Sequence, residues 1–217
     1  MLAARNMKEA GGRLLTGFLT LGLVLMAGCG PAPPATEAPG QESPPSRIGD
    51  RTSSVSPNLL EAAMAGEAEQ VREALAGGAD PGAPGEDGRT ALMLAAFNGH
   101  TETARLLLNH GARVGTRDGS GRTALMYAAS GPNEETVRLL LERSANPMEV
   151  DHEERFTALM FAAAEGQTDV VRTLLRHGSD PDMVDMDGDT ALDFATRNGH
   201  DEVVRLLRDK KVEESDP

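Results

Sequence analysis

The sequence is poor in the residues that build large aromatic cores and cross-links. It has no tryptophan, one tyrosine, five phenylalanines and a single cysteine among 217 residues. One cysteine excludes an internal disulfide and any metal site that needs several thiolates. Bases are scarce too, since 21 Lys and Arg stand against 34 Asp and Glu, for a formal net charge of −13. We therefore expect no nucleic-acid partner, because phosphate binding needs a basic face, and we expect a basic or neutral partner instead.

Motifs of catalysis and cofactor binding are also missing. The sequence has no serine nucleophile elbow, no glycine-rich phosphate loop and no paired cysteines. The acidic stretch "DPDMVDMDGDTALDF" at residues 180–194 is the best candidate for calcium. Aligning Gly188 with the glycine of an EF-hand loop puts Met183 and Phe194 at ligand positions that require carboxylates. We expect no enzyme activity, no cofactor and no metal site, and leave open weak cation binding by this stretch.

The N-terminus has the pattern of an export signal. A basic leader precedes an apolar run at residues 14–28, which is shorter than the roughly 20 residues of a membrane span. The run ends in "LMAGC", which resembles the bacterial lipobox. The resemblance implies that residues 1–28 are a lipoprotein signal peptide and that Cys29 becomes the lipidated N-terminus. An ordinary secretory peptide with an accidental cysteine is the alternative, and Met7 is an alternative start.

The residue after the cysteine bears on location. In the lipoprotein family an Asp there retains the protein at the inner membrane, and this chain has Gly30. We therefore expect a lipid-anchored protein of the bacterial cell envelope, at the outer membrane facing the periplasm if the host has two membranes. Removing residues 1–28 takes away one acid and three bases, so 33 acids and 18 bases remain and the net charge becomes −15.

Two regions follow the signal. Residues 29–56 hold six prolines and almost no large apolar side chain, which predicts a disordered tether. From residue 57 to about 209 the chain repeats itself, with copies that start at residues 57, 90, 123, 157 and 190. The phrases "TALM", "TALM", "TALM" and "TALD" open the last four copies. Residues 210–217 form an acidic tail.

Each copy predicts two helices and a projecting loop. In the second copy "TALMLAAFNGH" and "TETARLLLNHGA" place apolar residues on one helix face, and each ends in a glycine. Alanine pairs such as Ala95–Ala96 allow close approach of neighbouring copies. No copy could bury its apolar face alone, so the copies must stack. The last copy has Asp193 in place of Met, which we interpret as part of a polar C-terminal cap.

The copies resemble the ankyrin repeat. The phrases "GHTETARLLLNHGA" and "GQTDVVRTLLRHGSDP" carry the resemblance, which covers residues 57 to about 208. It implies an all-α solenoid of about five helix-turn-helix repeats with short β-hairpin loops. Where the family usually has Thr-Pro-Leu-His this chain has Thr-Ala-Leu-Met, so we expect soft apolar packing in place of a polar network. The repeat position of His100, His200, His110 and His177 favours structural roles over metal binding.

Charged pairs recur along the second helices. An acid stands three residues before an arginine in every copy, which predicts exposed ion pairs on one helix face, with a basic ladder for a partner as the alternative. The pairs are Glu69/Arg72, Glu102/Arg105, Glu135/Arg138, Asp169/Arg172 and Glu202/Arg205.

In ankyrin proteins the loop tips and the exposed end of the first helix form a concave binding face. Carried over by position, the resemblance implies partner contacts from both. The loop candidates are Glu86, Asp87, Arg89, Arg122, His152, Glu153, Phe156, Met186, Asp187 and Asp189, and the first-helix candidates are Phe97, Asn98, Glu165 and Arg197. Phe97 stands out because large aromatic side chains anchor interfaces. The last loop joins five aspartates to two methionines, which suits a basic, partly apolar protein surface, although the acids could serve solubility alone.

These features predict a non-enzymatic protein–protein interaction module tethered to the bacterial cell envelope. By analogy of fold alone, its partner is a toxin or a periplasmic enzyme, and the protein has a protective or immunity role. We expect a monomer that contacts the membrane only through its lipid. A structural envelope spacer and a small-molecule or ion-binding module that uses the acidic last loop remain the alternatives.

Overall fold

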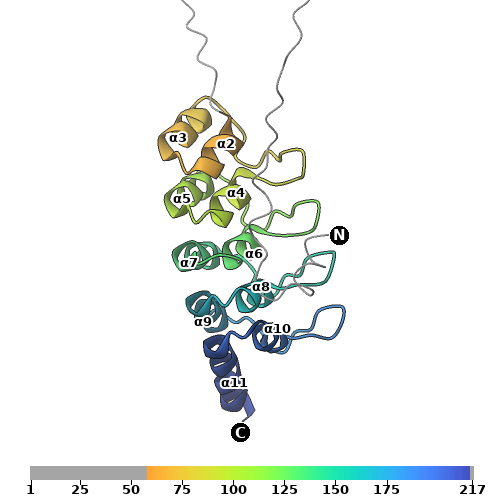
Figure 1. Cartoon of the computed structure of the whole chain (residues 1–217). Helices are drawn as coiled ribbons and strands as arrows, with labels where there is room; N and C mark the ends of the chain where they lie inside the picture. Colours follow the sequence, from red (N-terminus) through yellow and green to blue (C-terminus); the bar gives the residue numbers. More distant parts are fainter. Residues whose placement is uncertain (1–57, 216–217) are drawn as a thin grey trace, which may run out of the picture. The chain divides into compact units, whose positions relative to one another are not determined.

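The computed structural model describes residues 58–215. The predicted signal peptide, Cys29 and the predicted tether of residues 29–56 lie outside them. The described residues form ten helices in five pairs, stacked one pair upon the next from α2 and α3 to α10 and α11 (Figure 1). No helix among residues 58–215 is long and apolar enough to cross a membrane.

The first helix of each pair lies in one column and the second in another. The inner helices are α2 (Leu59–Ala65), α4 (Ala91–Phe97), α6 (Ala124–Ala129), α8 (Ala158–Ala164) and α10 (Ala191–Asn198). The outer helices are α3 (Ala68–Ala76), α5 (Thr101–Asn109), α7 (Glu134–Glu142), α9 (Thr168–Arg176) and α11 (Asp201–Ser215). The backbone of α11 therefore continues as helix past residue 209, into the segment assigned to the acidic tail.

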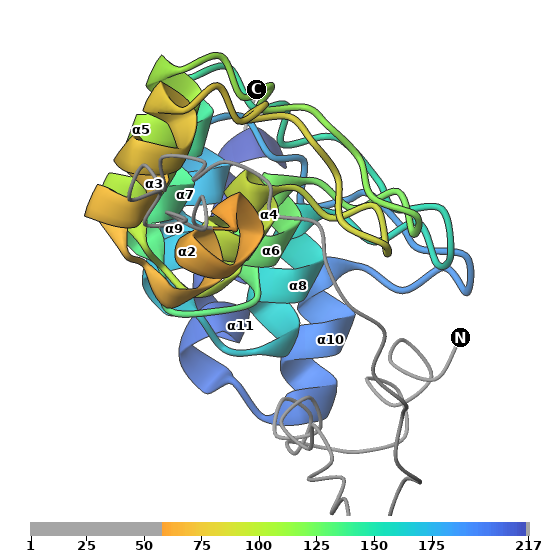
Figure 2. The ribbon, with the colours of Figure 1, turned by 90° about the horizontal axis from the view of Figure 1, so that it is seen from above.

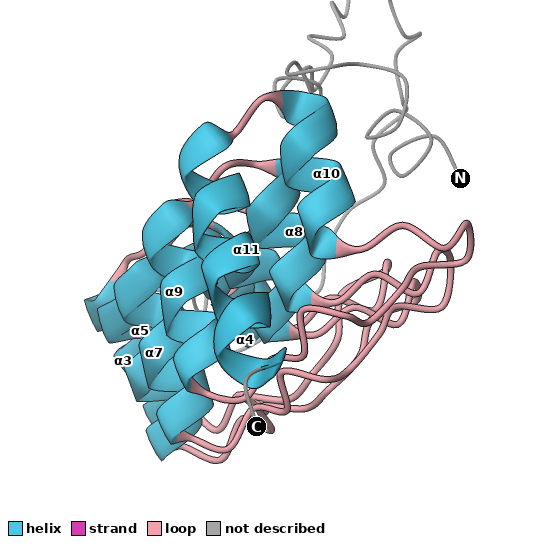
Figure 3. Cartoon of the chain, turned by 90° about the horizontal axis from the view of Figure 1, so that it is seen from below, coloured by secondary structure: helices cyan, strands magenta, loops and turns pink. Residues whose placement is uncertain are grey.

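Four loops join successive pairs, at residues 77–90, 110–123, 143–157 and 177–190, and we number them from first to fourth. Seen along the stack, they lie over one another on the side of the inner helices (Figure 2). No strand forms among the described residues (Figure 3), and one isolated bridge joins Pro84 to Thr90. The all-α solenoid is confirmed, but its loops are tight turns and not paired β-strands.

Small residues make the close stacking of the inner helices possible. The alanine pairs of α4, α6 and α8 have no exposed surface. Beside them Leu92, Leu125 and Leu159 occupy one repeat position and are each 1% exposed. A leucine buried in this way contributes about 1.5–3 kcal/mol of apolar burial. Because each pair of helices touches only its neighbours, that stabilisation is located at the interfaces between copies.

A glycine in one copy and a side chain of the next copy interlock at these interfaces. Gly66 ends α2 in the left-handed region, with φ 75°, and the His100 ring lies against it. A Cβ on Gly66 would come within 2.5 Å of that ring. The His100 Nε2 atom lies 3.1 Å from the carbonyl oxygen of Met64, and His200 repeats the contact on Ala164 at 2.9 Å.

The other two repeat-positioned histidines also bond within the array. The Nδ1 atom of His110 lies 2.9 Å from the Leu106 carbonyl oxygen, and that of His177 lies 2.8 Å from the Thr173 carbonyl oxygen. All four therefore have structural contacts of the kind predicted from their repeat positions.

The "TALM" phrase caps the inner helices in an unexpected way. The backbone N–H of Thr90 donates to the sulfur of Met93 at 3.4 Å, and that of Thr157 to Met160 at 3.5 Å. The prediction that methionine only packs is therefore incomplete, because its sulfur is a weak acceptor. In "TALD" the carboxylate of Asp193 accepts both the N–H and the hydroxyl of Thr190, at 2.8 and 2.6 Å. Asp193 is thus a capping-box acid of the terminal copy.

Three of the five predicted ion pairs on the outer helices are present. Glu69 pairs with Arg72, Glu102 with Arg105 at 4.0 Å, and Asp169 with Arg172 at 3.5 Å. All are well exposed, so solvent screens them and they contribute little to stability.

Candidate functional site

The sequence-predicted contact residues gather on one side of the array. They lie on the exposed side of the inner helices and on the four loops beside them, and we call this surface the inner face (Figure 2). Loops and helices contribute to it in different ways.

Three aspartates, two of them buried, hold the loops in shape. Asp118, Asp151 and Asp185 occupy one position in the last three loops, and the Oδ1 atom of each accepts two backbone N–H groups at 2.9–3.1 Å. This pairing explains why Asp151 and Asp185 are 1% and 4% exposed although they are charged. Asp185 is therefore a structural residue and not part of an exposed acidic patch.

The loop tips are joined to each other by backbone hydrogen bonds. Gly119 donates to the Asp87 carbonyl at 3.4 Å, His152 to Ser120 at 2.9 Å and Met186 to Glu154 at 3.0 Å. The four loops therefore form one connected row, and a partner would meet pre-ordered tips rather than separate ones.

Among the predicted tip residues, His152 and Glu153 also contact the second loop. The exposed His152 packs its ring over Gly121, while Glu153 accepts a bond from the Ser120 hydroxyl at 3.4 Å. Glu86 and Asp187 are exposed at their tips.

The arginines of the inner face are bonded to acids of the chain itself. Arg89 pairs with Asp87 in the first loop, and Arg197 pairs with Asp189 at 2.8 Å. Arg122 has the most extensive contacts. Its Nε atom lies 3.4 Å from the fully buried carboxylate of Asp151, and its Nη2 atom lies 4.0 Å from Glu153. Its guanidinium lies over the Phe161 ring, 5.1 Å from the centroid.

Phe156 is not a contact residue, so that prediction is wrong. Its side chain is 0% exposed and makes edge-to-face contacts with Phe161 and Phe194, at centroid distances of 5.6 and 5.1 Å. The side chain directly before the first threonine of a copy faces the aromatic residues of the inner helix that follows it and of the next inner helix. An arginine there covers a ring and keeps its charged end in water, whereas a phenylalanine enters the core.

The exposed aromatic surface lies in the N-terminal half of the inner face. Phe97 is 38% exposed and contacts Tyr127 edge-to-face at 6.1 Å. Met64, at the position of Phe97 in the preceding copy, is 53% exposed. The Tyr127 hydroxyl donates to Asp118 at 2.6 Å, and burial together with this carboxylate raises the pKa of Tyr127 above its ordinary value. The chain thereby orients the aromatic pair before any partner binds.

Two candidates at the ends of the inner helices differ in their bonding. The Asn98 side-chain amide donates to the carbonyls of Met64 and Leu94, both at 3.1 Å, so it links copies as well as lining the face. Glu165 ends α8 and is half-buried, and this burial raises the pKa of its carboxyl above the ordinary value. Glu165 is therefore an acid held in a poorly solvated position.

The fourth loop exposes apolar surface beside its acids. Met186 is 64% exposed, as predicted for a tip residue, and Val184 is 44% exposed. Sequence reasoning missed Val184 and Met64. The repeat position of Met64 matches that of Phe97 and would have identified it, whereas nothing in the sequence distinguishes Val184 from a core valine.

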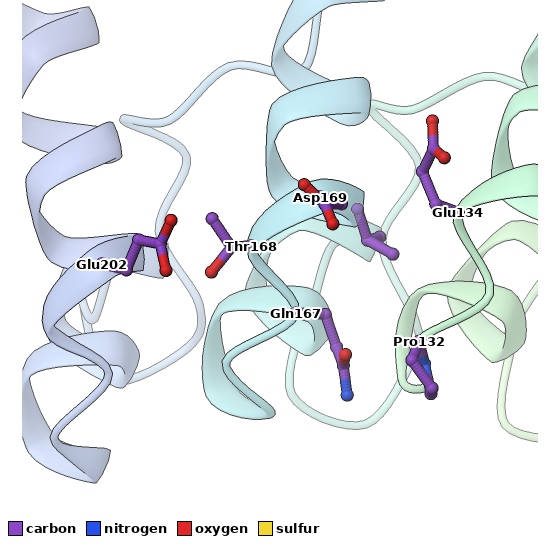
Figure 4. Close-up of a pocket in the computed structure, with 7 residues that line it drawn as sticks. Pro132, Glu134, Gln167, Thr168, Asp169 and Glu202 are labelled. Atoms are coloured by element: carbon purple, nitrogen blue, oxygen red, sulfur yellow. The ribbon is translucent and has the colours of Figure 1, made fainter.

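No group of three or more His, Cys, Asp and Glu that could hold a metal occurs among the described side chains. A shallow cavity of about 310 Å³ is lined by residues of the third, fourth and fifth copies (Figure 4). Its walls are the starts of outer helices α7, α9 and α11, with Glu134, Asp169 and Glu202 among the lining residues. Among these acids, Glu134 already accepts the Thr173 hydroxyl at 3.1 Å.

Comparison with known families agrees with this architecture. A family model described as "Ankyrin repeats (3 copies)" matches residues 59–151 and again residues 146–216. The chain belongs to the ankyrin-repeat family. Ankyrin repeats generally mediate protein–protein interaction, and proteins built from them are typically non-enzymatic interaction modules. A search of curated proteins returned no match to this ankyrin chain.

Proposed function

We propose that this ankyrin protein is a lipid-anchored, non-enzymatic binding module of the bacterial cell envelope, and that its inner face holds a protein partner. The observation that carries the proposal is the Phe97–Tyr127 pair. A large apolar side chain that is 38% exposed on a rigid surface is costly to leave in water, and aromatic residues of this kind anchor interfaces.

The location rests on the sequence. The chain's single cysteine, Cys29, follows an apolar run within "LMAGC", and the excess of acids suits a soluble array that extends into the periplasm. The partner is a protein with a basic or mixed apolar surface. A toxin or periplasmic enzyme, against which this protein has a protective role, fits that description.

Affinity capture from envelope extracts tests the binding function. The full chain is compared with Phe97→Ala and with Met148→Ala. Met148 is a control of similar exposure, 37%, which lies in the third loop, on a part of the inner face that carries neither Phe97 nor Tyr127. We expect one partner to be retained by the wild type and the control and lost by Phe97→Ala. Equal retention by all three proteins, or no specific retention at low salt, would contradict the proposal.

A separate variant tests the anchor. Cys29→Ser is expected to move the protein from the membrane fraction to the soluble fraction without changing its capture of the partner. Unchanged membrane fractionation would show that Cys29 is not lipidated.

A further inference from the structure

The charged side chains of the inner face differ in whether they have a partner within the chain. Its three candidate arginines, Arg89, Arg122 and Arg197, each have an acid of this chain as partner. An anionic ligand would have to break these pairs before it could use the guanidinium groups. The cations of the inner face are therefore already committed to the fold.

Glu165 is in the opposite situation. It is half-buried at the end of α8, and no ion pair or hydrogen bond to its carboxylate occurs among the described side chains. Burial without a partner is what raises the pKa of Glu165, and the effect of nearby His200 opposes it only in part. An ionised carboxylate in this position destabilises the free protein. A cation supplied from outside would remove that cost.

The apolar end of the same surface lies two copies away. Met64 and Phe97 occupy one position in consecutive copies, and the next two copies have the small Ser130 and Ala164 there. Glu165 follows Ala164 directly. Packed helices lie about 8–10 Å apart, so two steps along the inner helices separate Phe97 from Glu165 by about 16–20 Å.

We propose that the inner face binds an extended protein segment that places a large apolar side chain on Met64, Phe97 and Tyr127 and a lysine or arginine on Glu165. The inference rests on the proposed protein-binding function and specifies its ligand. In an extended chain, with about 3.3 Å per residue, 16–20 Å corresponds to five or six residues between the two side chains. A helix would need further anchors along Ser130 and Gly131, which offer little apolar surface.

The lack of other aromatic residues makes a direct binding assay possible. Tyr127 is the only tyrosine of the chain, and there is no tryptophan. The probe is a nonapeptide of Gly and Ser with one tryptophan and one lysine six positions apart. Binding to the purified full chain is followed by energy transfer from Tyr127 to the peptide tryptophan. Control peptides have glutamate in place of lysine, or the two residues three positions apart.

We expect the lysine peptide with six-residue spacing to bind about fivefold more tightly than its glutamate counterpart, as one ion pair at a partly exposed site allows. Glu165→Gln should abolish this preference, and Phe97→Ala should weaken both peptides at least tenfold. Glu202→Gln, an exposed acid on outer helix α11, should change neither affinity. The preference should fade as the pH falls, starting above the ordinary glutamate range because the pKa of Glu165 is raised.

Three results would overturn the inference: no energy transfer with any peptide, equal affinity for the lysine and glutamate peptides, or a preference that survives Glu165→Gln. The proposed function fails independently of these results. If the captured envelope protein is lost with Phe97→Ala but is retained by Glu165→Gln, the binding function stands and the cation site is refuted.

Discussion

Replacing Phe156 by alanine should separate the C-terminal copies from the rest of the array. The ring is fully buried between Phe161 of α8 and Phe194 of α10. Truncating a buried phenylalanine costs about 3–5 kcal/mol, since it removes apolar burial and leaves a cavity. Both neighbours also lose an edge-to-face partner. Against a typical total stability of about 5–15 kcal/mol, this loss is large.

The loss should be local, because each copy contacts only its neighbours. Urea unfolding of Phe156→Ala should give a lower midpoint, with α10 and α11 unfolding before α2–α5. Amide hydrogen exchange resolves the order, and the exposed Phe97→Ala serves as the control, with an expected loss below about 1 kcal/mol. A loss below about 1 kcal/mol for Phe156→Ala, or exchange that rises equally in all five copies, would refute the role of Phe156 as a core link between copies.

Further variants test three positions, Gly66, Asp193 and Glu165. Gly66→Ala should lower the free energy of unfolding in urea by about 2 kcal/mol more than Gly178→Ala, because both glycines have positive φ but only Gly66 lies against the His100 ring. Equal losses would show that the contact between Gly66 and His100 does not constrain this position. Asp193→Ala should lower the unfolding free energy by about 1 kcal/mol and Asp193→Met by less, since sulfur keeps a weak acceptor; an identical loss would show that sulfur does not cap. Glu165 has a raised pKa in the folded state, so the ionised form destabilises and the penalty appears as the pH rises through that pKa. At pH 7 Glu165→Gln should therefore have a higher melting temperature than the wild type, with a gain in unfolding free energy of no more than ~1 kcal/mol. Near pH 3 the two proteins should melt alike. A wild type that melts higher than the variant at pH 7 would contradict the destabilising effect of the ionised carboxylate.

The repeat period explains how much of the fold follows from sequence. Five copies in register place their helices within a few residues of the observed bounds, and glycines mark most of the helix ends, although Ser144 stands at that position after α7. The buried alanine pairs follow from the same periodicity. These features depend on contacts that every copy repeats, so they can be predicted by aligning the copies with one another.

The candidate site was less predictable, because it depends on differences between copies. Position alone makes Phe156 equivalent to Arg89 and Arg122, although a phenylalanine at that position is buried and an arginine stays partly exposed. Position also could not show that Asp118 and Asp185 fold their own loops, since this depends on backbone N–H groups two and four residues ahead. Asn98 is a further example, because its position predicts a partner contact and does not show that its side-chain amide donates to the Met64 carbonyl of the preceding copy.

The aromatic residues of the array show why only part of the inner face is available for binding. In the C-terminal half the rings of Phe161 and Phe194 are covered by the guanidinium groups of Arg122 and Arg197, at 5.1 and 5.5 Å from the ring centroids. Such stacking retains the apolar contact while presenting a polar, solvated group to the outside. Phe97 has no guanidinium stacked on it among the described contacts and keeps 38% of its surface in water.

A row of aromatic residues that only stabilised the stack would be covered throughout. The chain instead covers the rings next to its C-terminal cap and leaves open the pair in the second and third copies. Two copies further on lies the half-buried Glu165, to which no ion pair or hydrogen bond occurs among the described side chains. Exposed apolar surface and an acid whose burial is only partly offset by His200 each reduce the stability of the free protein. Their occurrence together on one pre-ordered face is therefore better explained by a ligand that meets both than by the requirements of the fold.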